Sequence, residues 1–141
     1  MAITNLTITD ADVAVEVTGT QIASVTWGAT VDEAVPVYYN SVTKKYLPTN
    51  AGTSQTLARA RGICLTGGAA DTVGLMVVRG EMDVGAPLVV GQLYCVSNTT
   101  GLISLYDDEF MAVSGIWITV LGVAITTSSL DLQIRPFGAT T

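Results

Sequence analysis

Few residue types that perform chemistry are present in this sequence. It contains no histidine, which excludes Ser-His and Cys-His nucleophile systems and argues against an ordinary zinc site. Gly67 and Gly68 are similar to a phosphate-binding loop only superficially, because no Gly-Lys-Ser/Thr follows them, and they are better interpreted as a turn. We therefore expect a protein that is not an enzyme, with no catalytic residues, no cofactor and no metal ion.

Acidic side chains form two groups that could have a chemical role. Residues 107–109, Asp-Asp-Glu, could bind calcium through clustered carboxylates, but they lack the alternating spacing and the glycine of a dedicated calcium loop. A solvated turn after Tyr106 is therefore the favoured interpretation. Glu81 and Asp83 share one face of a predicted strand and could form a carboxylate pair. A solvent-facing strand end explains them equally well.

Basic residues are unevenly distributed along the chain. Lys44, Lys45, Arg59 and Arg61 all fall within residues 34–70, a stretch that contains no acidic residue. Such a stretch could form a contact surface for an acidic partner, and we take Lys44 and Lys45 as candidate contact residues. The alternative is a solvated turn tip, which favours lysine whether or not a partner binds there.

The two cysteines are predicted to be structural. Cys64 and Cys95 both lie within apolar, strand-like runs, which indicates small core residues rather than a disulfide and fits synthesis in a reducing cytoplasm. The first residues also lack the basic and apolar segments of a signal peptide.

Composition restricts the classes of partner. The chain has 141 residues, 49% of them hydrophobic and 13% charged, with a mean hydropathy of +0.50 and a net charge of −6. This length predicts one domain with its own core, and the acidic charge argues against nucleic acid. The longest apolar run, residues 115–125, is shorter than the roughly 20 residues of a membrane-spanning helix. The apolar excess instead indicates burial against other protein chains.

The first dozen residues are predicted to form an N-terminal arm. They are rich in threonine, and Ile3, Leu6 and Ile8 are isolated apolar positions. We expect residues 1–12 to lie outside the core, to be disordered in the free protein and to become ordered as an added strand along a partner. Ile3, Leu6 and Ile8 are then candidate contact residues. Deleting residues 2–9 is expected to leave the remaining domain folded.

The rest of the chain predicts about ten short strands. Alternating residues 13–17 and 23–27 predict a hairpin that turns at residues 18–21. Strands are predicted at residues 35–40, 46–47, 62–66 and 73–84, with one helical turn within residues 53–60.

A second set of signals repeats the first. The strand–turn–strand pattern of residues 37–47 recurs at residues 85–104, with Tyr38 matching Tyr94 and Tyr46 matching Leu102. Residues 62–66 match 122–126, and residues 74–79 match 130–135, so that Arg79 matches Arg135.

We predict an all-β fold, a compact β-barrel or sandwich built from two similar hairpin-containing halves. The halves cover about residues 28–80 and 85–137 of a single domain, 13–141, that follows the arm. Gly101 is expected to turn the second hairpin with a positive φ.

This order of signals resembles the small head-decoration, or cement, proteins of tailed bacteriophages. The stretches that carry the resemblance are residues 28–45, 60–70, 85–101 and 120–126. The resemblance implies a compact β-domain, a homotrimer in the virion, that binds the major capsid protein on the outer capsid surface and braces neighbouring coat subunits. No catalytic or ligand-binding residue is carried over with it.

An alternative function belongs to another class. The chain could be a carbohydrate- or receptor-binding β-module on a phage head or tail, for which exposed tyrosines would be the characteristic feature. Tyr38, Tyr39, Tyr46 and Tyr94 are the candidates, although barrel or interface packing explains them better.

Overall fold

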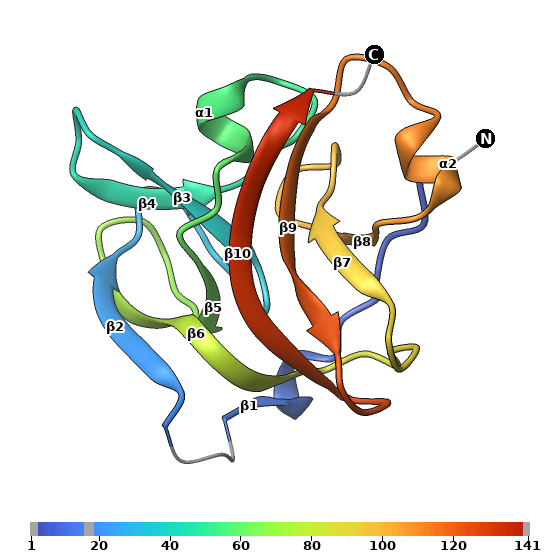
Figure 1. The fold of residues 1–141 in the computed structure, drawn as a ribbon. Coiled ribbons are helices and arrows are strands. Elements are labelled where there is room, and N and C mark those ends of the chain that lie inside the picture. Colours follow the sequence, from blue (N-terminus) through green and yellow to red (C-terminus); the bar gives the residue numbers. More distant parts are fainter. Residues whose placement is uncertain (1–2, 16–18, 140–141) are drawn as a thin grey trace.

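The computed structural model describes residues 3–15 and 19–139 (Figure 1). The described residues are 48% strand and 8% helix, and one antiparallel sheet curls into a half-barrel, which confirms the predicted all-β class. The elements, in chain order, are η1 (Asp10–Asp12), β1 (Val13–Ala14), β2 (Gln21–Thr26), β3 (Pro36–Asn40), β4 (Lys45–Pro48), α1 (Gln55–Ala58), β5 (Gly62–Thr66), β6 (Val73–Val84), β7 (Leu93–Val96), β8 (Ile103–Leu105), α2 (Asp108–Met111), β9 (Trp117–Ala124) and β10 (Ser129–Ala139).

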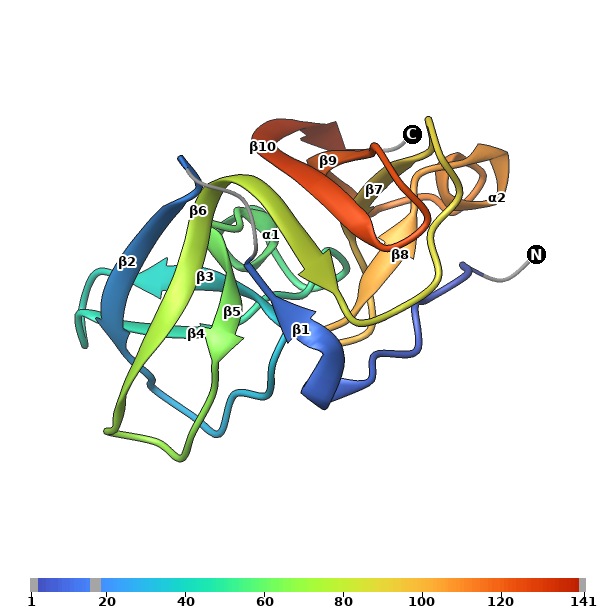
Figure 2. The same ribbon diagram turned by 90° about the horizontal axis from the view of Figure 1, so that it is seen from below.

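The two halves of the sheet have the same strand order when each is read inward from its outer edge. Its strands run β4-β3-β5-β6-β10-β9-β7-β8, so β3–β6 and β7–β10 are two copies of one unit that meet where β6 pairs with β10. Each unit is a hairpin, a short helix and a second hairpin. Figure 2 shows β2–β6 on one side and β7–β10 on the other. The predicted internal duplication is therefore present in the topology.

The short helices occupy equivalent places in the two units. α1 lies between β4 and β5, and α2 lies between β8 and β9. Each begins at a side-chain cap: the Ser54 hydroxyl accepts a hydrogen bond from the amide of Leu57 at 3.2 Å, and the Asp107 carboxylate accepts one from Phe110 at 3.0 Å. Such caps satisfy amide groups that have no partner within a helix.

Two glycines show the equivalence of the units at the residue scale. A Cβ on Gly62 would lie 2.7 Å from the carbonyl oxygen of Val77, and one on Gly122 would lie 2.0 Å from that of Asp131. Both strands thus approach their neighbour too closely for any side chain. The predicted match of these two glycines agrees with their positions.

Three of the predicted residue matches are wrong in register. Val77 and Asp131 are counterparts because they face equivalent glycines, so the counterpart of Arg79 is Gln133 and not Arg135. Val37 pairs with Gly62 and Tyr94 pairs with Gly122, so the counterpart of Tyr94 is Val37 and not Tyr38. Because Val37 also pairs with Pro48 and Tyr94 with Leu105, the counterpart of Tyr46 is Ile103 and not Leu102. These two hairpin matches are each displaced by one residue, and sequence spacing alone does not reveal the displacement. Gly101, in the turn between β7 and β8, has a φ of 77°, as predicted.

The predicted first hairpin is also wrong. β1 pairs with the end of β6 at Val84 and Asp83, whereas β2 pairs with the beginning of β6, from Val73 to Arg79. β6 is long enough to serve both strands: its first part lies between β5 and β2, and its last part lies between β10 and β1. Alternation predicted the strands but not their partners, because pairing depends on this distant strand.

The N-terminal segment is part of the domain, which corrects the prediction of an arm outside the core. Leu6 is only 9% exposed and belongs to the main core cluster. Its amide donates to the carbonyl of Ile103 at 2.8 Å, and the amide of Leu105 donates to the carbonyl of Thr4 at 3.0 Å. The free edge of β8 thus supplies, within the same chain, the backbone partners that an added strand requires.

The core is continuous across the two units. The larger cluster includes Ile63 and Val77 from the first unit and Tyr94 and Leu121 from the second. A smaller cluster surrounds Trp27, which is fully buried within the first unit. This shared core makes one body of the two halves. Among the described residues, no helix is long and apolar enough to cross a membrane.

Candidate functional site

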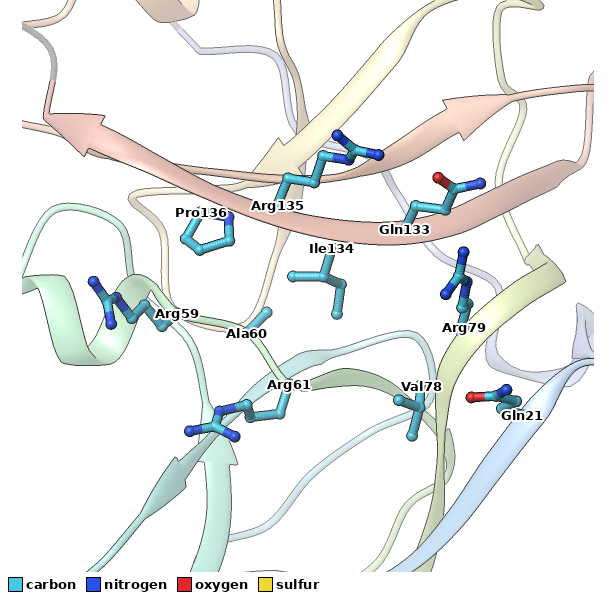
Figure 3. Close-up of a pocket in the computed structure, with 10 residues that line it drawn as sticks. All are labelled: Gln21, Arg59, Ala60, Arg61, Val78, Arg79, Gln133, Ile134, Arg135 and Pro136. Carbon is cyan, nitrogen blue, oxygen red and sulfur yellow. The ribbon is translucent and has the colours of Figure 1, made fainter.

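All four arginines of the sequence line one groove. Arg59 and Arg61 flank Ala60 between α1 and β5, Arg79 lies on β6, and Arg135 lies on β10 (Figure 3). The groove has a volume of about 590 Å³. In a chain with only six basic residues and a net charge of −6, this gathering of four is the most distinctive surface feature.

The groove opens where two central strands separate. β10 and β6 pair from Ser129 with Asp83 to Leu132 with Gly80, and beyond that point β10 continues beside β9 alone. Arg79 and Arg135 lie just past the last of these pairs, on the two diverging strands. The fork therefore places Arg79 and Arg135 on the two strands that border the groove, and Figure 3 shows the Arg135 side chain on the opposite face of β10 from Ile134.

The other two arginines are held by the segment that leads into β5. Arg59 is the residue after α1, and the amide of Arg61 donates to the carbonyl of Val37 on β3 at 2.7 Å. Ala60 between them is buried. Because the backbone is anchored on both sides of a buried alanine, both arginine side chains extend outward.

An apolar strip lies between the basic side chains. Ile134 and Pro136 lie on the face of β10 that is turned toward Ala60 and Val78, as Figure 3 shows. Ile134 and Val78 are half-buried. The polar side chains of Gln21 and Gln133 lie at the end near Arg79. The groove thus combines apolar contact with charged hydrogen-bond donors.

The electrostatic character of the groove is positive. None of the residues that line it is acidic, and the ion pair found in the described part of the chain, Lys45 with Asp71, lies elsewhere. All four arginines are exposed. A guanidinium group binds carboxylate or phosphate oxygens through two parallel hydrogen bonds, so this surface can recognise an anionic partner without performing chemistry on it.

The residues predicted as contacts do not form one site. Lys44, with a φ of 60°, lies at the exposed turn between β3 and β4, and Lys45 pairs with Asp71. Ile3, Leu6 and Ile8 pack against the main core, alongside β8. None of these five side chains lines the groove.

Sequence reasoning found half of the groove. It singled out Arg59 and Arg61 with the lysines, but it treated Arg79 and Arg135 only as landmarks of the repeat. One feature of the sequence could have grouped Arg79 and Arg135 with Arg59 and Arg61: these four are all the arginines of an acidic chain.

The predicted acidic groups have structural roles. Asp107 caps α2, and Asp108 and Glu109 lie in the first turn of that helix, where acidic side chains interact favourably with the helix dipole. The carboxylate of Asp83 accepts a hydrogen bond from the amide of Gly85 at 2.8 Å.

One acidic cluster was not foreseen. Carboxylate oxygens of Asp10, Asp32 and Glu33 lie within 4.8 Å of one another. Asp32 and Glu33 are adjacent in the sequence, whereas Asp10 is distant and reaches them because the N-terminal segment is folded onto the domain.

The two cysteines are core residues, as predicted. Cys64 and Cys95 are buried and free. Burial raises the pKa of the Cys64 thiol from 9.0 to about 12, and nearby Glu33 and Asp32 act in the same direction. Burial likewise raises the pKa of Cys95 to about 12, although a hydrogen bond with Ser104 opposes the shift. Both thiols stay protonated at neutral pH, so neither is a ready nucleophile or metal ligand.

The tyrosines do not form an exposed platform. Tyr94 is buried, and its hydroxyl accepts a hydrogen bond from the amide of Val89 at 3.0 Å. The rings of Tyr39 and Tyr46 pack against each other, with centroids 5.1 Å apart and planes tilted by 52°. Tyr38 and Tyr106 are half-buried.

No protein-family model, no curated protein and no solved structure matches this chain. The groove and the fold are therefore interpreted from their own geometry.

Proposed function

We propose that this chain is a structural virion protein that binds the major capsid protein on the outer surface of a tailed-phage head and stabilises it. The observation that carries the proposal is the groove lined by Arg59, Arg61, Arg79 and Arg135 on an otherwise acidic domain. A surface of this kind suits docking onto another protein, because concentrated positive charge selects an acidic partner and orients it.

The rest of the domain fits a docking role. Its two units share one sheet and one core, so load applied to one unit is transmitted to the other through the β6–β10 pairing. The buried, protonated thiols and the capped helices are structural features. A protein that braces coat subunits needs such rigidity and no active site.

Apolar side chains at the surface support assembly into a homotrimer at the capsid. Exposed large apolar side chains occur on several elements, and they are Ile22, Val42, Val73, Leu75, Val89, Val90, Leu93, Met111, Ile125 and Phe137. Contacts among three copies and with the coat would cover part of this surface.

Co-sedimentation tests the proposed function. Expanded, empty capsids of a tailed phage, assembled from the coat protein encoded beside this chain's gene if such a gene is found there, are mixed with the purified protein and pelleted. We expect the protein to pellet with capsids at saturable stoichiometry. Protein that stays in the supernatant at every capsid concentration would overturn the proposal.

A carbohydrate- or receptor-binding module remains the second candidate. It would require exposed aromatic rings, whereas Tyr94 is buried and Tyr39 packs on Tyr46. Saturable binding of the isolated chain to a glycan array, together with no binding to capsids, would favour this candidate instead.

A further inference from the structure

One wall of the arginine groove is a strand with an open edge. β10 pairs with β6 only as far as Leu132, and from Gln133 to Ala139 it has β9 as its neighbour on one side and no strand on the other among the described residues. The backbone N–H and C=O groups on that open side are available to a further strand, except at Pro136, which has no N–H.

Edge protection alone does not explain the arginines. Charged residues and prolines often prevent unwanted pairing at an edge, and Arg135 and Pro136 on β10 could serve that purpose. Arg79, however, lies on β6, a central strand, and Arg59 and Arg61 lie outside the strands. Three arginines on elements that need no protection line the same groove, which indicates a ligand.

The form and charge of the groove define that ligand. An extended chain rises about 3.3 Å per residue, so a short segment could follow the open part of β10 and place alternate side chains on either side. Side chains directed at Arg59 and Arg61, or at Arg79 and Arg135, would have to be acidic, whereas Ile134 and Val78 offer apolar contact.

We infer that the groove binds an extended acidic segment of a partner protein, which adds to the open edge of β10 as a further strand. The inference rests on the proposed docking function and names the chemistry of the partner segment. A backbone that pairs with β10 must be a peptide, and the net charge of −6 disfavours nucleic acid.

A second copy of this chain is a poorer occupant. The longest acidic run in the sequence, residues 107–109, belongs to α2 and its cap, so it is helical and cannot add as a strand. Asp71, another exposed acidic residue, is already paired with Lys45. The partner is therefore expected to be a different protein.

A peptide-binding measurement tests the inference on the isolated full chain. The probe is a fluorescein-labelled peptide of alternating glutamate and valine, and the readout is fluorescence polarisation at about 0.15 M salt, where weak surface attraction is screened. A second probe of identical sequence carries N-methyl groups on all of its backbone amides, so it keeps the charge but has no N–H group with which to pair as a strand. We expect the first probe to bind and the second to bind at least about tenfold more weakly.

Matched variants locate the binding site. Arg59→Gln with Arg61→Gln should weaken binding of the first probe at least about tenfold. Lys44→Gln, which removes a positive charge outside the groove, should leave it within about twofold. Equal binding of the two probes, an equal effect of the two charge changes, or no binding of either probe would overturn the inference. Arginine-dependent self-association seen by light scattering would overturn the choice of a different protein as partner.

The peptide test fails separately from the capsid test. Protein that pellets with capsids but binds neither peptide would leave the proposed function standing and remove this inference. Protein that binds the peptide through its arginines but never pellets with capsids would leave the peptide-binding groove standing and overturn the proposed function.

Discussion

At the scale of single residues, the buried thiols couple stability to alkaline pH. The pKa of Cys64 and that of Cys95 are raised by burial from 9.0 to about 12 in the folded protein. Above pH 9 the unfolded chain loses thiol protons that the folded chain retains, so the free energy of unfolding falls as pH rises toward 12. The loss is at most about 1.4 kcal/mol per thiol for each pH unit.

Urea unfolding at pH 8 and pH 10 measures this dependence. The variant Cys64→Ala with Cys95→Ala should lose stability at both pH values because of the cavities, but its decline between them should be shallower than that of the wild type. Equal declines would show that other groups dominate the alkaline transition.

Leu6 tests the corrected position of the N-terminal segment. Because its side chain is 9% exposed and packs in the main core, Leu6→Ala should lower the free energy of unfolding by about 2–3 kcal/mol. The exposed neighbour Thr7 provides the control, and Thr7→Ala should change it by less than about 0.5 kcal/mol. Similar, small effects of both changes would return the segment to the role of a detached arm.

At the scale of elements, the close contact between β9 and β10 predicts a strong asymmetry between two glycines. A methyl group on Gly122 would lie 2.0 Å from the carbonyl oxygen of Asp131, whereas one on Gly138 would have no atom within 4 Å. Gly122→Ala should therefore cost about 2 kcal/mol or more, and Gly138→Ala should be nearly neutral. Thermal unfolding of both variants measures the difference, and equal melting temperatures would contradict the strand register.

The elements also show which structural features sequence can predict. β3, β5 and β6 lie where alternation and turn residues placed them, because both signals are local. The partners of β1 and β2 were missed, since their pairing depends on the length of β6, far along the chain. The position of Leu6 was missed for a similar reason: the edge of β8 that receives its segment is distant in sequence.

The candidate site, too, was predictable only where it depends on residues that are close in sequence. Clustering of Arg59 with Arg61 is visible in the sequence, since Ala60 alone separates them. Their approach to Arg79 and Arg135 depends on the divergence of β10 from β6 after Leu132. That divergence is a feature of the tertiary structure, and no local sequence pattern predicts it.

At the scale of the whole molecule, the proposed homotrimer makes a quantitative prediction. Exposed side chains such as Val89, Val90 and Phe137 require cover, and three-fold repetition uses one interface three times. Mass photometry should detect trimers of the free chain, or a density map of decorated capsids should show three copies at each site. A single copy at each occupied site would contradict the trimer.

The most direct test of the central claim is a binding isotherm on expanded capsids for the wild type, the Arg59→Gln with Arg61→Gln variant and the Lys44→Gln control. If the arginine groove docks the protein onto the coat, the double variant should bind at least about tenfold more weakly, and the control should match the wild type within about twofold. Circular dichroism of each variant verifies its fold. Equal affinity of all three folded proteins for capsids would contradict docking through the groove.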